Sequence, residues 1–478
     1  MKVSTLASLS TTTSIPNTPF LQKQKPIDFG KNKVGHFSIS TTESKQNFPF
    51  LPRCSAKPHA TDEGLLSVQP DSRSRPEGEP KPVTGNQIGF SPGPLISRGL
   101  VFDLGSASSW DGVEIGSPVV KRYLGDEEER WYLWYHGRSG KNPGSDSIGL
   151  AVSSNGAHWE RGEGGVRSGG DVGMVMSCSE DWWGFDTESL MPSEVVIMSS
   201  NKVNRSNTAV YWLYYTGFSS QAVDFSAGNS LGFCLENPER AYLGNGNKSL
   251  TSGAKQGVMK SLPGLAISQD GRHWARIEGE HHSGALFDAG QEGDWDSLFI
   301  ASPHVIYHGN GDLRMYYHSF DAENGCFAIG MARSRDGIKW VKQGRMIGEG
   351  GVGAFDELGV MNPNVVRNRK DGRYIMAYEG VGVDGRRSIG VAISPDGLKG
   401  WRRVVGCNPV LRGCEGGDGW DCEGVGSPCL VQMDGEDEVG QWRLYYRGVG
   451  RGGRTGIGMA VSNGRDFHNF QRWTGFHL

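Results

Sequence analysis

The 478-residue sequence lacks several features that would place it in other protein classes. No apolar run approaches the roughly 20 residues that a membrane-spanning helix needs, so no transmembrane span is expected. The net charge is −4 and the charged residues are spread along the chain, without the basic stripe of a nucleic-acid-binding protein. The 72 glycines follow no collagen-like period, and we therefore attribute them to turns between many short strands.

The cysteines lack the close spacing of a zinc site. Eight occur, and four of them follow one another at intervals of seven, eight and seven residues: Cys407, Cys414, Cys422 and Cys429. Structural zinc sites use tight Cys-x2-4-Cys pairs, so we expect no metal site here. Two interpretations stay open, which are free buried or half-buried thiols and a redox-linked pair.

Acidic residues are scarce in the first 54 residues. This segment is rich in Ser and Thr, carries six Lys and one Arg, and contains only Asp28 and Glu43 as acids. Such a composition is typical of an organelle transit peptide, and PRCSA (52–56) is similar to a plastid cleavage region. We predict a chloroplast transit peptide over 1–54, a disordered linker over 55–90 and a stromal protein, with a merely disordered tail as the alternative.

The sequence repeats one pattern five times. Each copy opens with an aromatic-Asp pair, continues through a Pro-led apolar segment and a Tyr-rich segment, and ends in a sequence similar to IGLAxSxDGxxW. The short β-branched and aromatic segments, separated by Gly, Asp and Asn, are typical of strands, and such repeats indicate a ring or a stacked array. The opening pairs are Trp110-Asp111, Phe185-Asp186, Trp295-Asp296, Phe355-Asp356 and Trp420-Asp421.

We predict an all-β fold, a five-bladed β-propeller over residues 91–478 with four antiparallel strands in each blade. The Pro-led segment is the least charged and is expected to be innermost. Copy five has no clear fourth strand, whereas GPLISRG (93–99) is similar to the missing one, so this N-terminal strand should pair with blade five and close the ring. A long insertion in blade two (218–262) is predicted to be a lid over the mouth or a disordered loop.

The repeat resembles that of the glycosidase-like five-bladed β-propellers, which include glycoside hydrolase families 43, 32, 62, 68 and 130 and the arabinanases, invertases and levansucrases. The pattern WDxxxxxSPxVV, YYxYYxG and IGxAxSxDGxxW carries this resemblance over roughly residues 93–478. It implies a propeller that acts on carbohydrate with two carboxylates at the central funnel. In family 43 these acids lie on the innermost strands of the first three blades, near the proline.

The sequence departs from this family pattern at the expected acids. Val119 stands where the first-blade acid is expected, and Ala301 stands where the third-blade acid is expected. Glu194 is the one carboxylate directly after the proline position, so ordinary two-carboxylate hydrolysis is not expected. The candidate catalytic residues are Glu194, with Glu188 or Glu379 as a second acid.

Polar residues that differ from blade to blade are the candidate ligand-binding residues, because a concave site with a few convergent polar groups is the usual ligand site. The repeat aspartates are assigned to structure instead, since a residue present in all five blades is expected to stabilise a turn in each. The candidate ligand-binding residues are His304, Asn364, His136, His318 and Arg447.

Two functions stay open. The first is a binding scaffold with a degenerate catalytic set, for an oligosaccharide or a plastid protein. The second is an active glycoside hydrolase or phosphorylase with Glu194 as the key acid. A phosphorylase needs one carboxylate and a phosphate held by cations, for which Arg447 with His136 or His318 is a candidate set. No cofactor is implied. A salt-bridged Glu194 in a closed funnel favours the scaffold, whereas a second carboxylate about 5–10 Å away favours hydrolysis.

Overall fold

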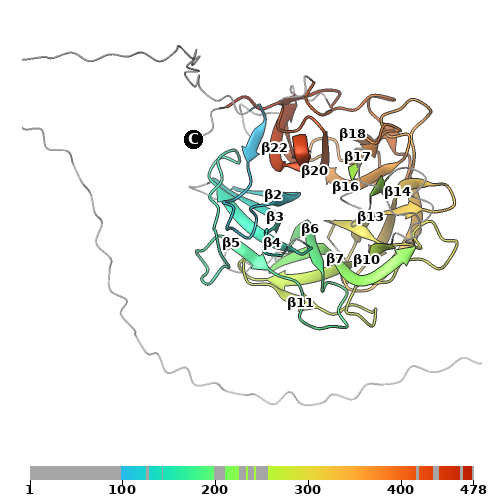
Figure 1. Cartoon of the computed structure of the whole chain (residues 1–478). Coiled ribbons are helices and arrows are strands. Elements are labelled where there is room, and N and C mark those ends of the chain that lie inside the picture. Colours follow the sequence, from blue (N-terminus) through green and yellow to red (C-terminus); the bar gives the residue numbers. More distant parts are fainter. Residues whose placement is uncertain are drawn as a thin grey trace, which may run out of the picture. The chain divides into compact units, whose positions relative to one another are not determined.

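The computed structural model describes residues 98–124, 129–142, 144–198, 210–224, 233–234, 242–243, 257–309, 311–415, 419–433, 441–462 and 467–475. Over these residues the chain forms five antiparallel sheets around one axis (Figure 1). The prediction of an all-β, five-bladed propeller is confirmed. No helix among the described residues is long and apolar enough to cross a membrane. The predicted transit peptide and linker lie outside the described residues.

Each blade contains four strands in sequence order, counted from the axis outward. Blade 1 contains β2 (Glu114–Leu124), β3 (Glu129–Arg138), β4 (Asp146–Ser153) and β5 (Gly173–Met176). Blade 2 contains β6 (Ser189–Met198), β7 (Val210–Asp224), β10 (Gly257–Ser268) and β11 (Ala275–Ile277). Blade 3 contains β12 (Ala301–Tyr307), β13 (Leu313–Asp321), β14 (Cys326–Ser334) and β15 (Trp340–Ile347). Blade 4 contains β16 (Val360–Arg367), β17 (Tyr374–Val381), β18 (Arg387–Ser394) and β19 (Arg402–Arg403). Blade 5 contains β20 (Gly424–Gln432), β21 (Trp442–Val449), β22 (Thr455–Ser462) and β23 (Phe470–Arg472).

Four short elements lie outside this scheme. They are β1 (Leu100–Phe102), the two-stranded pair of β8 (Phe233–Cys234) with β9 (Tyr242–Leu243), and the 3-10 turn η2 (Arg451–Gly453). Strands β7 and β10 pair out to Asp224 and Gly257, so both ends of the predicted blade-two insertion continue a hairpin. The predicted lid itself lies largely outside the described residues.

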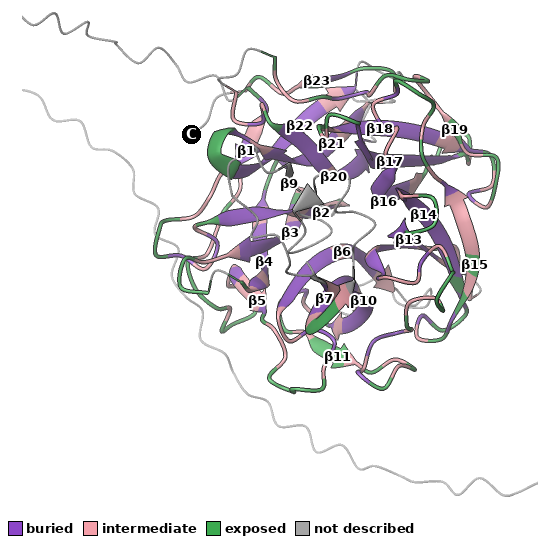
Figure 2. Ribbon diagram, turned by 45° about the vertical axis from the view of Figure 1, so that its right-hand side comes forward, coloured by how far each residue is buried: buried purple, intermediate pink, exposed green. Residues whose placement is uncertain are grey.

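The Pro-led strands are innermost, as predicted. Strands β2, β6, β12, β16 and β20 neighbour one another in cyclic order around the axis, and most of their length is buried (Figure 2). The first two strands of each blade are antiparallel, so the aromatic-Asp loops and the ends of the Tyr-rich strands meet at one mouth. Backbone bonds from Val113 N to Arg138 O and from Glu423 N to Val449 O join the two at this face.

The ring is closed by the N-terminal strand of the propeller. Strand β1 pairs with β22 through Leu100 opposite Gly458, and Met459 N donates to Gly99 O at 2.8 Å. Closure through blade five is therefore confirmed, but the closing strand is Leu100–Phe102, directly after the predicted segment 93–99. Residues 98–99 of that segment form a turn, and residues 93–97 lie outside the described residues. The expectation that copy five lacks a fourth strand is wrong, because β23 also pairs with β22. The reason is that the 470–472 strand is too short to be recognised from its pattern.

Each repeat aspartate joins the second strand of its blade to the outer strand region. Asp186 accepts a hydrogen bond from Tyr215 Oη at 3.0 Å and from Arg276 Nε at 2.7 Å. All five aspartates accept from a tyrosine of their own blade and lie beside a cation of the outer strand region. A group used identically in five blades is structural, which agrees with the assignment made from the repeat.

Candidate functional site

Two rings of equivalent residues surround the axis, one from each blade. The lower ring follows the proline position of the inner strands. The upper ring lies near the ends of the second strands, on the mouth side. The lower ring consists of Val119, Glu194, His304, Asn364 and Cys429. The upper ring consists of His136, Thr216, His318, Glu379 and Arg447.

The lower ring is a closed belt of buried groups. His304 Nδ1 lies 3.0 Å from Glu194 Oε2, and Lys121 Nζ forms an ion pair with the same carboxylate. His304 Nε2 donates to Val365 O at 2.8 Å. Asn364 and Cys429 continue the belt, since each accepts a hydrogen bond from a backbone N–H of the next blade.

This belt leaves little room at the axis. The axial cavity, lined by the Ser-Pro segments of the inner strands, has a volume of about 30 Å³, which is about the space of one water. Burial opposes the charge of Glu194, yet the adjacent Lys121 and His304 outweigh it and hold the pKa of this carboxyl below its usual value. Glu194 is therefore a salt-bridged carboxylate beside a nearly filled axis.

Three members of the upper ring link adjacent blades. Each accepts a hydrogen bond from the backbone N–H of a left-handed residue that precedes the proline of the next inner strand. The φ angles of these donors are 51° at Ser302, 50° at Asn362 and 45° at Ser427. Such conformations are strained for residues other than glycine, and the bonds hold them in place. The three bonds are Ser302 N to Thr216 Oγ1 at 2.8 Å, Asn362 N to His318 Nδ1 at 3.2 Å, and Ser427 N to Glu379 Oε2 at 2.8 Å.

The two remaining members of the upper ring depart from this rule. Arg447 has no acceptor atom, so it does not cap the inner strand of blade 1. The inner strand of blade 2, which follows His136 in the ring, has no left-handed residue among the positive-φ positions. Both side chains approach Glu114 instead, with Arg447 Nη2 at 2.9 Å and His136 Nε2 at 3.8 Å from Glu114 Oε1.

Blade 1 adds two more charges to form what we call the blade-one cluster, which consists of Glu114, His136, Arg138, Asp146 and Arg447. Arg138 bridges the two carboxylates, with Nη1 at 3.5 Å from Glu114 Oε2 and Nε at 3.1 Å from Asp146 Oδ1. Asp146 also accepts from Ser189 Oγ of blade 2 at 2.5 Å. Glu114 is the one carboxylate among the five equivalent positions, three residues after each repeat aspartate.

The surroundings shift the pKa values of the two carboxylates of this cluster, Glu114 and Asp146, in opposite directions. Burial raises the pKa of Glu114, but Arg447, His136 and Arg138 prevail and lower it to about 2. At Asp146 burial prevails over Arg138, and the pKa rises to about 7. Burial also lowers the pKa of His136. The two acids thus differ in their proton occupancy although they share one arginine.

A cavity opens at the mouth between blades 4 and 5, and we call it the mouth cavity. Its volume is about 530 Å³, and its lining includes Glu379, Arg387 and Arg447. Arg387 Nη1 donates to Glu379 Oε1 at 2.6 Å. Gly426 makes room for this pair, since a Cβ there would collide with the Glu379 carboxylate. In the same way, a Cβ at Gly116 would lie 2.5 Å from Arg447 Cδ.

A second space, which we call the outer cavity, adjoins the mouth cavity. Its volume is about 730 Å³. Both cavities are lined by the same six residues at their common wall: Asp384, Arg386, Arg387, Cys422, Glu423 and Gly424. Together they form a groove that leads outward from the axis over blades 4 and 5.

The structure distributes the candidate residues over separate places. Glu379 and Arg447 share the mouth cavity. Glu194, His304 and Asn364 belong to the lower ring. His136 joins the blade-one cluster, and His318 caps Asn362, with burial and then Arg387 lowering its pKa to about 3. Glu188 is half-buried at the rim, where its backbone N–H bonds Phe218 O, and it does not line the mouth cavity.

Sequence reasoning missed Arg138, Asp146 and Arg387. Their signal lies in the repeat: Asp146 and Arg387 occupy one equivalent position, two residues before the isoleucine that pairs with the upper ring. Blades 2, 3 and 5 carry Ser261, Phe327 and Thr455 there. Comparison of this position between copies would have identified both residues.

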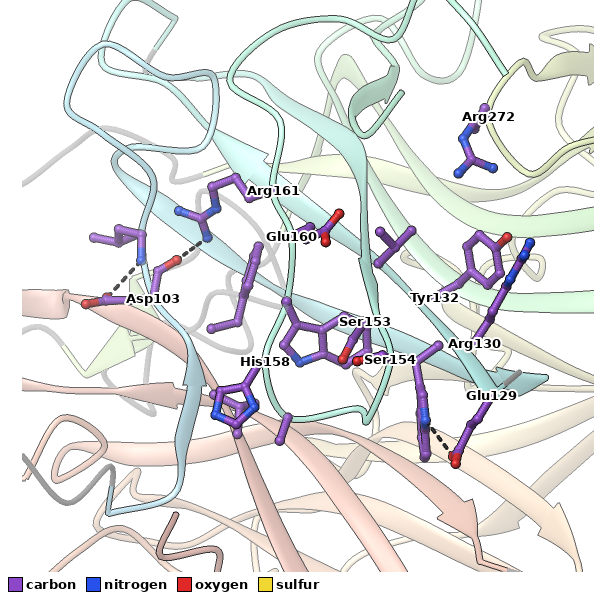
Figure 3. Close-up of a pocket in the computed structure, with 17 residues that line it drawn as sticks. Asp103, Glu129, Arg130, Tyr132, Ser153, Ser154, His158, Glu160, Arg161 and Arg272 are labelled. Carbon is purple, nitrogen blue, oxygen red and sulfur yellow. Dashed lines mark hydrogen bonds between the residues drawn. The ribbon is translucent and has the colours of Figure 1, made fainter. Parts of the chain in front are cut away.

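A further cavity lies beside blade 1 and away from both rings. It has a volume of about 1070 Å³ and is bounded by β1, the start of β3 and the turn after β4 (Figure 3). Two of its charged groups bind neighbours: Arg161 donates to Asp103 O, and Glu129 accepts from Trp131 Nε1 at 2.7 Å. No member of either ring lines it, so we do not assign the principal site to it.

No family model matches this sequence. Uncharacterized protein Rv1502 of Mycobacterium tuberculosis strain H37Rv is 31% identical over 212 residues, which are 42% of this chain and 61% of that protein. Uncharacterized protein MT1551 of strain CDC 1551 matches with the same identity and coverage. The alignment thus spans about three fifths of the length of these curated relatives.

Several solved structures are similar to this chain. BT0996, solved as an RGII complex, has 15% identity and a TM-score of 0.49, covering 78% of this chain and 93% of its own. A structure on the GH130 family of mannoside phosphorylases and glycoside hydrolases has 14% identity and a TM-score of 0.48, covering 80% and 97%. An N-acetylgalactosamine deacetylase from F. plautii, in complex with blood group B trisaccharide, has 14% identity and a TM-score of 0.48, covering 77% and 94%. The structural neighbours thus include glycoside hydrolase-like propellers, at an identity that assigns no residue or reaction.

Proposed function

We propose that this chain is a plastid carbohydrate-binding propeller that holds an acidic oligosaccharide in the mouth cavity, without two-carboxylate hydrolysis. The observation that carries the proposal is the convergence of Glu379, Arg387 and Arg447 on one cavity. The side chains of Glu379 and Arg447 are buried, with 1% and 5% of the residue exposed. Each of these buried charges is held at the cavity wall by a partner, since Glu379 bonds Arg387 and Arg447 bonds Glu114.

The chemistry of the lining supports an acidic ligand. Arg386, Arg387 and Arg447 present guanidinium groups, which bind carboxylate and phosphate oxygens in a bidentate manner. Glu379 and Glu423 offer acceptors for sugar hydroxyls. A volume of about 530 Å³ lies within the usual range of small-molecule sites. The carbohydrate class follows from the resemblance of the repeat to glycosidase-like propellers.

The state of the buried carboxylates supports the absence of ordinary hydrolysis. A glycosidase needs a general acid whose pKa is raised and a second carboxylate across an open site. The pKa values of Glu114 and Glu194 are both lowered by neighbouring cations. Asp146 has the raised pKa, but it is fully buried behind Arg138 and does not line the mouth cavity.

Calorimetric titration tests this binding. The mature protein is titrated with uronic-acid, phosphorylated and neutral oligosaccharides of equal length. We expect the acidic ligands to bind, and Arg387→Gln to weaken them about tenfold through loss of one charged contact. Arg373→Gln, at an exposed surface pair, is the matched control and should leave affinity unchanged. Equal affinity for neutral and acidic ligands would contradict an acidic specificity.

Phosphorolysis at the same cavity is the second candidate function. One carboxylate, Glu379, lies beside two arginines, which is the set that a phosphate and a sugar leaving group require. Incubation with oligosaccharides and inorganic phosphate, followed by detection of sugar phosphate, tests it. Turnover lost in Glu379→Gln supports this candidate. If Glu194→Gln abolishes turnover and Glu379→Gln does not, the catalytic acid is Glu194 and not Glu379.

Plastid location is part of the proposal and has its own test. A fluorescent protein fused behind residues 1–60 should enter chloroplasts, because of the Ser/Thr-rich and acid-poor composition of the first 54 residues. A fusion that stays in the cytosol contradicts the location, and it leaves the ligand site unaffected.

A further inference from the structure

Three free thiols line the outer cavity, namely Cys407, Cys414 and Cys422. Cys407 is exposed, and the other two are half-buried. Four arginines line the same cavity: Arg386, Arg387, Arg412 and Arg451. The cavity gives these thiols access to small solutes, which reactive cysteines require.

Three other thiols, Cys178, Cys326 and Cys429, are packed against neighbouring residues. Burial raises the pKa of Cys178 to about 11, that of Cys326 to about 12 and that of Cys429 to about 11. Cys326 Sγ lies 3.2 Å from Glu349 Oε2, and Cys429 Sγ accepts from Val120 N at 3.4 Å. These three thiols have neighbouring groups around them, whereas Cys407, Cys414 and Cys422 line a cavity.

Cys414 and Cys422 lie on two segments that are in contact. A Cβ at Gly419 would lie 2.7 Å from Cys414 Cβ and 3.1 Å from Cys414 Sγ. Cys422 N donates to Gly419 O at 3.3 Å, so one turn separates Gly419 from Cys422. On the other side, a Cβ at Gly413 would lie 3.2 Å from Cys422 O. A disulfide joins cysteines whose Cα atoms are about 4.4–6.8 Å apart, a separation that this contact brings within reach.

We propose that Cys414 and Cys422 form a reversible disulfide and that this bond controls ligand access to the mouth cavity. One thiolate attacks a low-molecular-weight disulfide such as oxidised glutathione, and a glutathione thiolate leaves. The second cysteine thiolate attacks the mixed disulfide and releases the second glutathione. The two cysteine protons are taken up by the two glutathione thiolates, and two electrons pass from the protein to glutathione.

The position of Cys422 connects the bond to the ligand site. Cys422 and Glu423 belong to the wall shared by both cavities, and β20 begins one residue later at Gly424. A bond to Cys414 draws the two walls of the groove together and narrows the passage between the cavities. The coupling to ligand binding rests on the proposed function, whereas formation of the disulfide does not.

Peptide mapping of the full-length protein tests the bond. The protein is equilibrated with reduced and oxidised glutathione, alkylated, and cleaved after Arg and Glu. Cys414 then lies on peptide 413–415 and Cys422 on peptide 416–423, while Cys407 lies on a separate peptide. We expect these two peptides to be linked under oxidising conditions and free after reduction. Two free peptides at every glutathione ratio, or a link from either one to Cys407, would overturn the assignment.

Ligand affinity of the oxidised and reduced protein tests the coupling. We expect oxidation to weaken binding about fivefold, a common size for coupling between two sites. Cys414→Ser should abolish this difference, and Cys407→Ser is the matched control that should retain it. If protein that carries the disulfide binds the acidic oligosaccharide as tightly as reduced protein does, the disulfide does not control ligand access to the mouth cavity. Failure of both redox forms to bind any acidic oligosaccharide, with the disulfide present, counts against the proposed function instead.

Discussion

The lower and upper rings are built at equivalent places of the same five blades, yet they differ in what their side chains contact. In the lower ring, Glu194, His304, Asn364 and Cys429 bind partners in neighbouring blades. In the upper ring, Arg447 also reaches the next blade and meets Glu114 of blade 1, whereas His136 approaches the same carboxylate within its own blade. A variable polar residue in a repeat can therefore link two blades and also line a cavity, as Glu379 and Arg447 do.

The sharpest test of this difference is removal of the lower-ring carboxylate. Glu194→Ala leaves Lys121 and His304 without their partner, and loss of one member of a buried ion pair costs about 3–5 kcal/mol of unfolding free energy. Chemical denaturation measures this loss. Ligand affinity of the folded variant should stay unchanged, and a stable variant without binding would move Glu194 into the site.

The blade-one cluster should show its own dependence on pH. The pKa of Asp146 is about 7 in the fold against an ordinary value of 3.8, so the native state retains a proton that the unfolded state loses. The unfolding free energy should therefore fall by about 3 kcal/mol as the pH rises from about 4 to about 7. The variant Asp146→Asn should remove this slope in denaturation curves measured at each pH. A slope that persists in Asp146→Asn would place the titrating group elsewhere.

Glu114 should make the unfolding free energy rise with pH, opposite to Asp146, in the same denaturation experiment. Its pKa is about 2 in the fold against an ordinary 4.5, so its stabilisation is complete above pH 4.5 and is lost as the pH falls toward 2. Asp146 changes the unfolding free energy between about pH 4 and 7, and Glu114 changes it between about pH 2 and 4.5. Because these ranges overlap only near pH 4, one series of denaturation curves distinguishes the two acids.

Filling the space beside Glu379 tests the mouth cavity. In Gly426→Ala the new Cβ must displace the Glu379 carboxylate, and overpacking of this kind costs about 1–3 kcal/mol. We expect ligand affinity to fall together with stability, as measured by calorimetry and denaturation. Gly351→Ala is the matched control, because a Cβ at Gly351 meets nothing within 4 Å. Normal affinity in Gly426→Ala would show that Glu379 takes no part in binding.

The smallest effect is expected where the upper ring has only a structural contact. Thr216→Val removes the acceptor for Ser302 N, and an unsatisfied buried N–H costs about 1–3 kcal/mol. We expect a loss near the low end of this range, with unchanged ligand affinity. A loss of affinity in Thr216→Val would contradict the assignment of Thr216 to the blade junction alone.

The repeat alone was sufficient to predict the fold, because strand patterns and turns are local properties of the sequence. It also allowed the aspartates to be assigned to structure, since five equal copies imply one shared role. The closing strand was predicted in the correct blade, but β23 was missed, because three residues carry too little pattern.

The candidate site could be predicted only in part. Glu379 and Arg447 were identified as deviations from the repeat, and they share one cavity. Arg387 and Asp146 were missed because their position was not compared between blades. The partnership of Lys121 with Glu194 joins inner strands of two blades, which no spacing within one copy reveals.

The sequence by itself therefore determined the number of blades, the order of the strands and the places where the copies differ. Only the tertiary structure decided which differing residues face a cavity and which link neighbouring blades. The physical reason is that strand periodicity is encoded within each copy, whereas ion pairs and cavities arise between copies. Their geometry depends on how each side chain reaches across the junction, as Arg447 does to Glu114.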